Sequence, residues 1–386
     1  MPLFLLVIFG LYSAVHFYTF LKIKAAFPFG IVPGIFLGVF MAVMTCAPIL
    51  VRILERHGYE LTARLTAYIG YSWMGILFIF FSLSLLFDLY RLFIYAAGLF
   101  LHRDLASIIP PAAISFLILT FLALCIAVYG YLDALNVRPE MITIRTSKVP
   151  ETIHSLRIVQ ISDVHLGIIV RQGRLQRILK VIHEANPDIL VSTGDLVDSQ
   201  IDSLSGLADA LKEIQPRYGK YAVTGNHEFY AGLPHALEIT TRAGFTVLRN
   251  EAVTVSGLIN IAGVDDPTAK YLGLSSGLLE DQLLSRLPKD TFTLLLKHQP
   301  IIREDSLGLF DLQLSGHTHQ GQIFPFRYMV HIFFSHIAGW YDLPKGSHLY
   351  VSRGTGTWGP PIRFLSSPEV TVIDLIHESQ HLSEAL

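Results

Sequence analysis

The sequence predicts an α/β domain that follows a membrane-spanning N-terminal region, and three observations support this prediction. Hydrophobic residues make up 52% of the 386 residues and charged residues only 16%, a balance outside that of soluble domains. The apolar excess lies in residues 1–142, which hold 8 of the 29 Lys and Arg and 6 of the 31 Asp and Glu. From about Met141 onward, short β-rich runs alternate with helical stretches, a pattern typical of α/β layering.

The membrane region, residues 1–140, contains four apolar runs long enough to cross about 30 Å of hydrocarbon at about 1.5 Å per residue. None contains a charged residue, and they cover residues 3–21, 31–50, 65–87 and 114–132. A signal peptide is the alternative for the first run, but the run is too long and no Lys or Arg precedes it. Residues 92–101 are too few to cross, and they follow Asp88 and Arg91, so we expect an interfacial stretch there. The sequence therefore predicts an integral, multi-pass membrane protein.

Four crossings place both termini on one side of the membrane, and the positive-inside rule favours the cytoplasm for that side. Six basic residues flank the spans on the side of the α/β domain: Arg52, Arg56, Arg64, Arg138, Arg145 and Lys148. Four lie opposite: Lys22, Lys24, Arg91 and Arg103. Lys22 and Lys24, taken alone, favour the opposite orientation. We therefore expect the α/β domain in the cytoplasm, because six basic residues flank the spans on its side and four on the other.

The polar two-thirds carries a formal charge of −4, which argues against a nucleic-acid partner, because phosphate-backbone binders need clustered Lys and Arg. Both cysteines, Cys46 and Cys125, lie in the apolar runs. The polar part therefore contains neither a disulfide nor a thiolate metal site. No feature of the sequence specifies an oligomeric state.

Within the polar part, strands are expected at 157–161, 189–192, 221–224, 292–296, 312–314 and 349–352. Helices are expected between several of them, including 174–185 and 204–214. In α/β layering, functional side chains gather on the loops at strand ends.

These strand ends carry oxygen and imidazole donors, namely Asp163, His165, Asp195, Asn226, His227, Glu228, His298, His317 and His319. In an extended chain, residues i and i+2 face the same way, so Asp163 with His165 and His317 with His319 would each direct two donors at one point. Glycines precede Asp195, Asn226 and His317, and they allow the backbone to approach a compact centre. Carboxylate, amide and imidazole donors suit Mn, Fe or Zn.

In this order, D-x-H, G-D, G-N-H-E, a lone H and G-H-x-H resemble the five motifs of the calcineurin-like metallophosphoesterase superfamily. The stretch G-H-T-H-Q-G-Q, and the later S-R-G-T-G and P-I-R-F, also resemble its bacterial branch often found behind membrane segments. Gln320 departs from that branch, which usually has glycine there. The resemblance covers residues 150–376 and implies an αββα sandwich, in which paired β-sheets are flanked by helices.

The resemblance also implies two divalent metal ions. One would be held by Asp163, His165, Asp195 and His319. The other would be held by Asp195, Asn226, His298 and His317, so that Asp195 bridges the ions. His227 would be catalytic, Glu228 structural, and Arg353 and Arg363 would serve either packing or phosphate contact.

Two ions and two carboxylate ligands leave a positive site that selects an anion and suits hydrolysis of a phosphoester or pyrophosphate. His227 would neutralise the leaving group. The four spans and the aromatic-rich residues 323–341 suggest a lipid-linked or other membrane-associated substrate, with a core-packed β-hairpin as the alternative for that segment. A water-soluble phosphorylated small molecule also remains open.

Two other classes of function compete with this hypothesis. One is a metal-binding sensor or regulatory module without turnover, which the full set of donors disfavours. The other is a transporter regulated by the domain, which the charge-free apolar runs disfavour, because transport paths usually contain ionisable residues.

Overall fold

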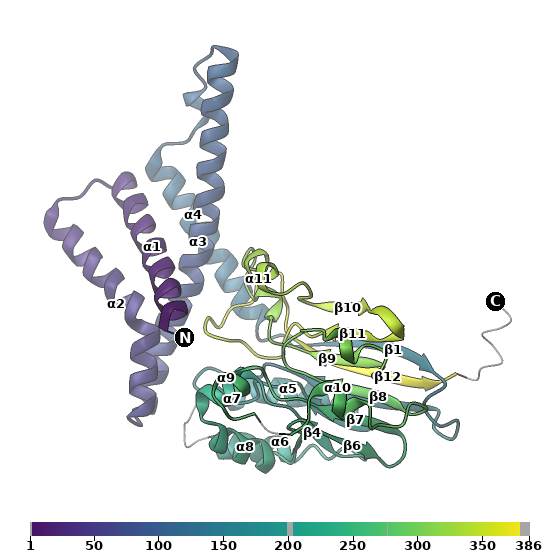
Figure 1. Ribbon diagram of the computed structural model, residues 1–386. Coiled ribbons are helices and arrows are strands. Elements are labelled where there is room, and N and C mark those ends of the chain that lie inside the picture. Colours follow the sequence, from purple (N-terminus) through teal and green to yellow (C-terminus); the bar gives the residue numbers. More distant parts are fainter. Residues whose placement is uncertain (1, 199–203, 276, 379–386) are drawn as a thin grey trace. The chain divides into compact units, whose positions relative to one another are not determined.

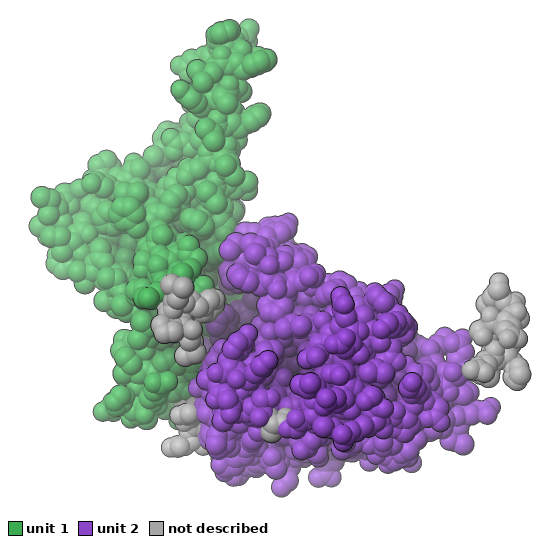
Figure 2. All heavy atoms as spheres, viewed as in Figure 1, with its two compact units in different colours: residues 1–132, 359–364 green, residues 133–358, 365–386 purple. Residues whose placement is uncertain are grey.

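The computed structural model describes residues 2–198, 204–275 and 277–378, and the chain divides into two compact units (Figures 1 and 2). Unit 1 runs from the N-terminus to Leu132 and also includes Gly359–Phe364. Unit 2 comprises the rest of the described residues, beginning at Asp133.

Unit 1 is helical. Its long helices are α1 (Pro2–Ala26), α2 (Ile31–Arg56), α3 (Glu60–Leu101) and α4 (Ala112–Asp133), and a short turn of 3₁₀-helix, η1 (Ala106–Ile108), precedes α4. All four are long and apolar enough to cross a membrane. The α2 and α3 helices approach closely at Gly70, where an added Cβ would lie 2.6 Å from the Cβ of Ala47. Small residues therefore set the spacing of this helix pair.

The expectation that residues 92–101 are separated from the third apolar run is wrong. The α3 helix continues unbroken for 42 residues to Leu101, a length of about 63 Å at 1.5 Å per residue. Asp88 does not interrupt it, because Tyr18 of α1 donates a hydrogen bond to Asp88 over 2.7 Å and Lys22 forms an ion pair with the same carboxylate. Partners on the neighbouring helix thus satisfy a charge that we expected to mark a boundary.

Unit 2 contains two six-stranded mixed sheets (Figure 1). The first has the order β1 (Arg138–Thr146), β12 (Glu369–His377), β2 (Ser155–Ile161), β3 (Ile189–Ser192), β4 (Lys220–Ala222) and β5 (Thr246–Val247). The second has the order β10 (Gly339–Asp342), β11 (His348–Val351), β9 (Leu312–Ser315), β8 (Phe292–Leu296), β7 (Ile259–Gly263) and β6 (Glu251–Val255).

Strand alternation divides the apolar residues between the two faces of each sheet. Ile158 of the first sheet and Leu294 of the second belong to one core cluster between the sheets. Leu295 points the other way and joins an outer cluster with Leu284 of α10 (Glu280–Leu284). On the first sheet, α5 (Gln172–Ala185) buries an apolar stripe that includes Ile178. The α/β class and the sandwich of paired sheets are therefore confirmed.

The remaining helices are short: α6 (Leu204–Lys212), α7 (Asn226–Ala231), α8 (Leu233–Arg242), α9 (Thr268–Tyr271) and α11 (Arg327–Phe333). Single turns of 3₁₀-helix are η2 (Glu304–Ser306), η3 (His319–Gly321) and η4 (Pro344–Gly346). All six expected strands are present within two residues of their expected bounds, as β2, β3, β4, β8, β9 and β11. The strands β1, β5, β6, β7, β10 and β12 were not anticipated.

The segment 323–341 is not a hairpin packed on the core. Its middle forms α11, in which no side chain is buried. Ile332 is 70% exposed and Phe333 73% exposed. Only β10 joins a sheet, as an edge strand antiparallel to β11. The apolar side chains of α11 therefore form a projecting surface on unit 2.

Candidate metal centre

The predicted site residues follow the carboxyl ends of five strands. Asp163 and His165 come after β2, Asp195 after β3, and Asn226 and His227 after β4, and these three strands are parallel neighbours. In the second sheet, His298 follows β8, and His317 and His319 follow the parallel strand β9. Parallel strands bring their carboxyl ends to one edge of a sheet, so segments far apart in the sequence meet there.

The backbone of these loops differs from the extended chain that we assumed for D-x-H and H-x-H. Asp163 and His165 both have φ near +53°, and His317 has +71° and His319 +48°. Residues other than glycine rarely adopt this left-handed backbone conformation. It costs about 1–3 kcal/mol per residue where the surroundings enforce it. The paired donors therefore converge through strained turns rather than through pleating. Such strain is concentrated at functional sites.

The glycines allow the close approach that their positions predicted. A Cβ on Gly225 would lie 2.2 Å from Oδ1 of Asp195, and one on Gly316 would lie 2.2 Å from Oδ2 of Asp163. Gly194 has φ +96°, and its Cβ would meet the backbone nitrogen of Gly225 at 2.6 Å. A larger residue at Gly194 or Gly225 would push apart neighbouring loops of the first sheet, and one at Gly316 would push apart the loops of the two sheets.

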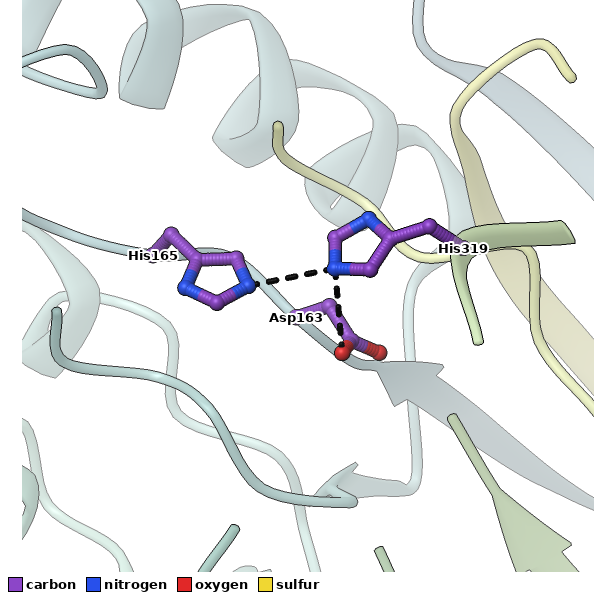
Figure 3. A group of neighbouring side chains, drawn as sticks. All are labelled: Asp163, His165 and His319. Atoms are coloured by element: carbon purple, nitrogen blue, oxygen red, sulfur yellow. Dashed lines mark hydrogen bonds and ion pairs between the residues drawn. The ribbon is translucent and has the colours of Figure 1, made fainter. Parts of the chain in front are cut away.

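Asp163, His165 and His319 form one group of donors (Figure 3). Nε2 of His165 and Nε2 of His319 are 3.2 Å apart, and Nε2 of His319 is 3.4 Å from Oδ1 of Asp163. All three side chains are buried. Two imidazole nitrogens and one carboxylate oxygen thus face a single point.

A second group consists of Asp195, His298 and His317. Oδ2 of Asp195 is 3.1 Å from Nε2 of His298, which lies 3.2 Å from Nδ1 of His317. The same Oδ2 is 3.9 Å from Nε2 of His165, which belongs to the first group. Asp195 therefore lies between the two groups of donors.

Two further features of the site concern the side-chain oxygen of Asn226 and the charge of Asp195. Oδ1 of Asn226 is buried and has no hydrogen-bond partner within the described part of the chain. An unpartnered buried carbonyl oxygen is costly, so it favours a site that a cation would complete. Burial alone would raise the pKa of Asp195, but the imidazoles of His298 and His227 hold that pKa well below its usual range.

Comparison with known proteins agrees with this geometry. Residues 156–321 match the calcineurin-like phosphoesterase family. An uncharacterized metallophosphoesterase of Aquifex aeolicus is 40% identical over 256 residues, which cover 66% of this chain and 98% of that protein. The chain belongs to the calcineurin-like metallophosphoesterase family.

Two further relatives differ in length. The Bacillus subtilis metallophosphoesterase YkuE is 35% identical over 268 residues, covering 64% of this chain and 89% of that protein. A Danio rerio transmembrane protein with a metallophosphoesterase domain is 36% identical over 273 residues, covering 66% of this chain. The match spans about three fifths of that longer protein, 62% of its length.

Metallophosphoesterases use divalent metals, and the donors present here fit such ions. Carboxylate, amide and imidazole groups are ligands for Mn, Fe and Zn. They lie in a buried, glycine-lined site in which the ligand atoms of each group are within 4.8 Å of one another. The prediction that His/Asp clusters able to hold metal would lie at the strand ends is therefore confirmed.

His227 lies beside this metallophosphoesterase centre with a partner that sequence analysis missed. Its Nδ1 is 2.5 Å from Oδ1 of Asp198, and its ring centroid is 4.7 Å from that of His165. A carboxylate accepts a hydrogen bond, so Nδ1 carries a proton and Nε2 faces away from Asp198. Asp198 lies three residues after Asp195, in G-D-L-V-D, where it completes none of the motifs.

Two other motif residues have structural contacts. The Glu228 carboxylate accepts hydrogen bonds from the backbone nitrogens of Gly225 at 2.6 Å, Asp195 at 3.0 Å and Val197 at 3.1 Å, so it ties two site loops together. The Arg353 guanidinium forms ion pairs with Glu140 at 2.7 Å and Glu369 at 2.6 Å. Arg353 therefore holds β1 and β12 rather than a phosphate.

Proposed function

We propose that this metallophosphoesterase is a metal-dependent phosphohydrolase with two divalent ions, held to the membrane by its four N-terminal helices. One ion would bind Asp163, His165, Asp195 and His319, and the other Asp195, Asn226, His298 and His317. The position of Asp195 between the two donor groups is the observation that carries this proposal. When bound, two such ions lower the pKa of a shared water and neutralise phosphoryl oxygens.

The chain's own residues would complete the hydrolysis. The oxygen of water bonds to phosphorus and releases one proton to solvent, while the bond from phosphorus to the leaving oxygen breaks. That oxygen takes a proton from Nε2 of His227, which then regains a proton from solvent. The contact of Nδ1 with Asp198 would orient the ring and stabilise its positive charge. The strained, glycine-lined loops hold the donors in place before substrate arrives.

Replacement of the shared carboxylate tests this proposal. In the full chain in detergent micelles, Asp195→Ala should lower hydrolysis of a chromogenic phosphodiester at least about a thousandfold, on the order of 4 kcal/mol in activation free energy. Glu238→Ala, on the exposed face of α8, is a control for the loss of a carboxylate elsewhere. Wild-type turnover by the Asp195 variant in the presence of a chelator would refute the two-metal proposal.

We further propose that the substrate is a lipid-linked phosphoester or pyrophosphate. Two features support this substrate class. The link between α4 and β1 is four residues long, so at most about 14 Å of extended chain joins a membrane-capable helix to the first strand of the catalytic unit. The exposed face of α11 is apolar, and residues 321–341 contain no acidic residue, so they suit an anionic lipid surface.

Comparing a lipid-linked with a short-chain phosphate of the same head group tests the substrate class. The lipid-linked compound should have the higher kcat/KM in mixed micelles. Equal values for both would reject the lipid proposal and leave the hydrolase proposal intact.

For the orientation, we propose multiple crossings with the catalytic unit in the cytoplasm. The basic residues flanking the helices favour this side. A C-terminal reporter that is active only in the cytoplasm should be active, and activity only of a reporter specific for the opposite side would reverse the orientation.

A further inference from the structure

Two half-exposed aromatic side chains flank His227. The ring centroid of Tyr230 is 5.5 Å from that of His227, and the centroid of Trp358 is 5.8 Å from it. Both rings meet the imidazole edge to face, at 70° and 74°. Each aromatic residue is 52% exposed, so neither is core material. Together with the imidazole, they present aromatic surface to solvent at the metal centre.

The position of Trp358 is fixed through its backbone. Gln322 accepts a hydrogen bond from the Trp358 nitrogen at its Oε1, and it donates one from Nε2 to the Trp358 carbonyl, both 2.9 Å long. Gln322 is itself 8% exposed and closely follows His319 in the chain. Because its backbone is already held, Trp358 loses little backbone entropy when it binds a ligand. The site therefore maintains an exposed indole without burying it.

We infer that Trp358 and Tyr230 bind the leaving group of the substrate and select leaving groups that carry a planar ring. This inference rests on the proposed function, in which Nε2 of His227 donates its proton to the leaving oxygen. A group bonded to that oxygen lies beside the imidazole, where these two rings are exposed. Aromatic faces stack on planar rings whatever substituents these carry. A flexible alkyl chain gains less binding free energy from the same faces.

The test uses esters of methylphosphonic acid, because each has a single leaving group. One ester carries 4-nitrophenol and the other n-hexanol, and the ratio of variant to wild type is taken for each, so that intrinsic reactivity cancels. Trp358→Ala should raise KM for the aryl ester about tenfold, the size expected for the loss of one stacking contact, and should change KM for the hexyl ester by about twofold or less. Trp358→Phe should retain most of the preference for the aryl ester.

Two matched variants separate stacking from general damage. Trp340→Ala removes a tryptophan whose ring contacts His348 instead of the site, and Tyr271→Ala removes an 86% exposed tyrosine; neither should change the aryl preference. Gln322→Ala should lower the preference in the same direction as Trp358→Ala, because it releases the indole.

The outcomes distinguish this inference from the function on which it rests. If the wild type hydrolyses the esters with metal and Trp358→Ala loses activity equally on both, or on neither, Trp358 has no role in leaving-group selection. If the wild type shows no metal-dependent hydrolysis of either ester, the proposed function itself is wrong.

Discussion

The metal centre buries polar side chains, whereas the α11 helix exposes apolar ones, so each region departs from the usual distribution of side chains between core and surface. At the centre, the polar side chains of Asp163, Asp195 and His298 are at most 2% exposed. On α11, which begins eight residues after His319, the apolar side chains of Ile332 and Phe333 are at least 70% exposed. Burying polar groups and exposing apolar groups both raise the free energy of a protein in plain water.

The difference shows which surroundings each region requires. Buried carboxylates and imidazoles that face one another are stabilised by cations bound between them. Exposed apolar side chains are stabilised by an apolar phase, which a chain with four long apolar helices meets at the membrane. Under the proposals above, the first region would account for the chemistry and the second for the substrate class.

The largest effect expected from a change beside the centre is that of His227→Ala. The variant should retain its metals, because neither of the two groups proposed to hold the ions contains His227, and turnover should fall about 10² to 10⁴ fold, most for poor leaving groups. Metal analysis together with rates across a leaving-group series checks this. A uniform loss accompanied by loss of metal would make His227 structural.

A smaller effect is expected from Asp198→Asn, which keeps the size of the side chain next to His227. An amide can no longer stabilise a charged imidazole, so turnover should fall about 10 to 100 fold with little change in KM. Asp209→Asn, on the exposed face of α6, serves as the control. Equal effects of the two variants would remove Asp198 from the mechanism.

Changes to the exposed apolar residues of α11 should affect only the hydrolysis of lipid-linked substrates. The double variant Ile332→Asp and Phe333→Asp should lower kcat/KM for a lipid-linked substrate in micelles roughly tenfold, because charged residues disfavour insertion, and should leave hydrolysis of a soluble ester unchanged. Replacement of Tyr271, which is 86% exposed, by Asp is the control. If the double variant matches wild type on both substrates, α11 does not contact lipid.

Lys220 shows that a buried polar group need not depend on a metal. Its ammonium donates hydrogen bonds to the carbonyls of Leu211 and Ala243, both at 2.8 Å, and burial lowers its pKa to about 8. Between about pH 8 and the ordinary lysine value near 10.4, the unfolded chain binds more protons, so folding stability rises with pH there.

The thermal midpoint of wild type minus that of Lys220→Met should therefore increase slightly from pH 8 to pH 10, and chelation should not change this difference. Thermal unfolding in detergent with and without chelator measures it. A difference that shrinks with pH would contradict the lowered pKa.

The site was predictable because its donor residues lie directly after the carboxyl ends of parallel strands, and the sequence predicts those strands. The strand after which Asp195 lies, β3, has the bounds that were expected. Asp198 was missed because a lone carboxylate three residues on carries no pattern until His227 lies against it. The left-handed backbone at His317 and the exposure of Phe333 depend on contacts between distant segments, which local sequence does not specify. The continuity of α3 likewise depends on partners of Asp88 in α1.

The central claim is that Asp195 joins two donor groups into one two-metal site. Metal content of the purified full chain measures this directly, by elemental analysis of wild type and of Asp195→Ala under the same conditions. The account predicts two divalent ions per wild-type chain, with hydrolysis rising as the second is bound, and less than one ion per chain in the variant. Full hydrolytic activity with one ion or none, or an unchanged metal content in Asp195→Ala, would contradict it.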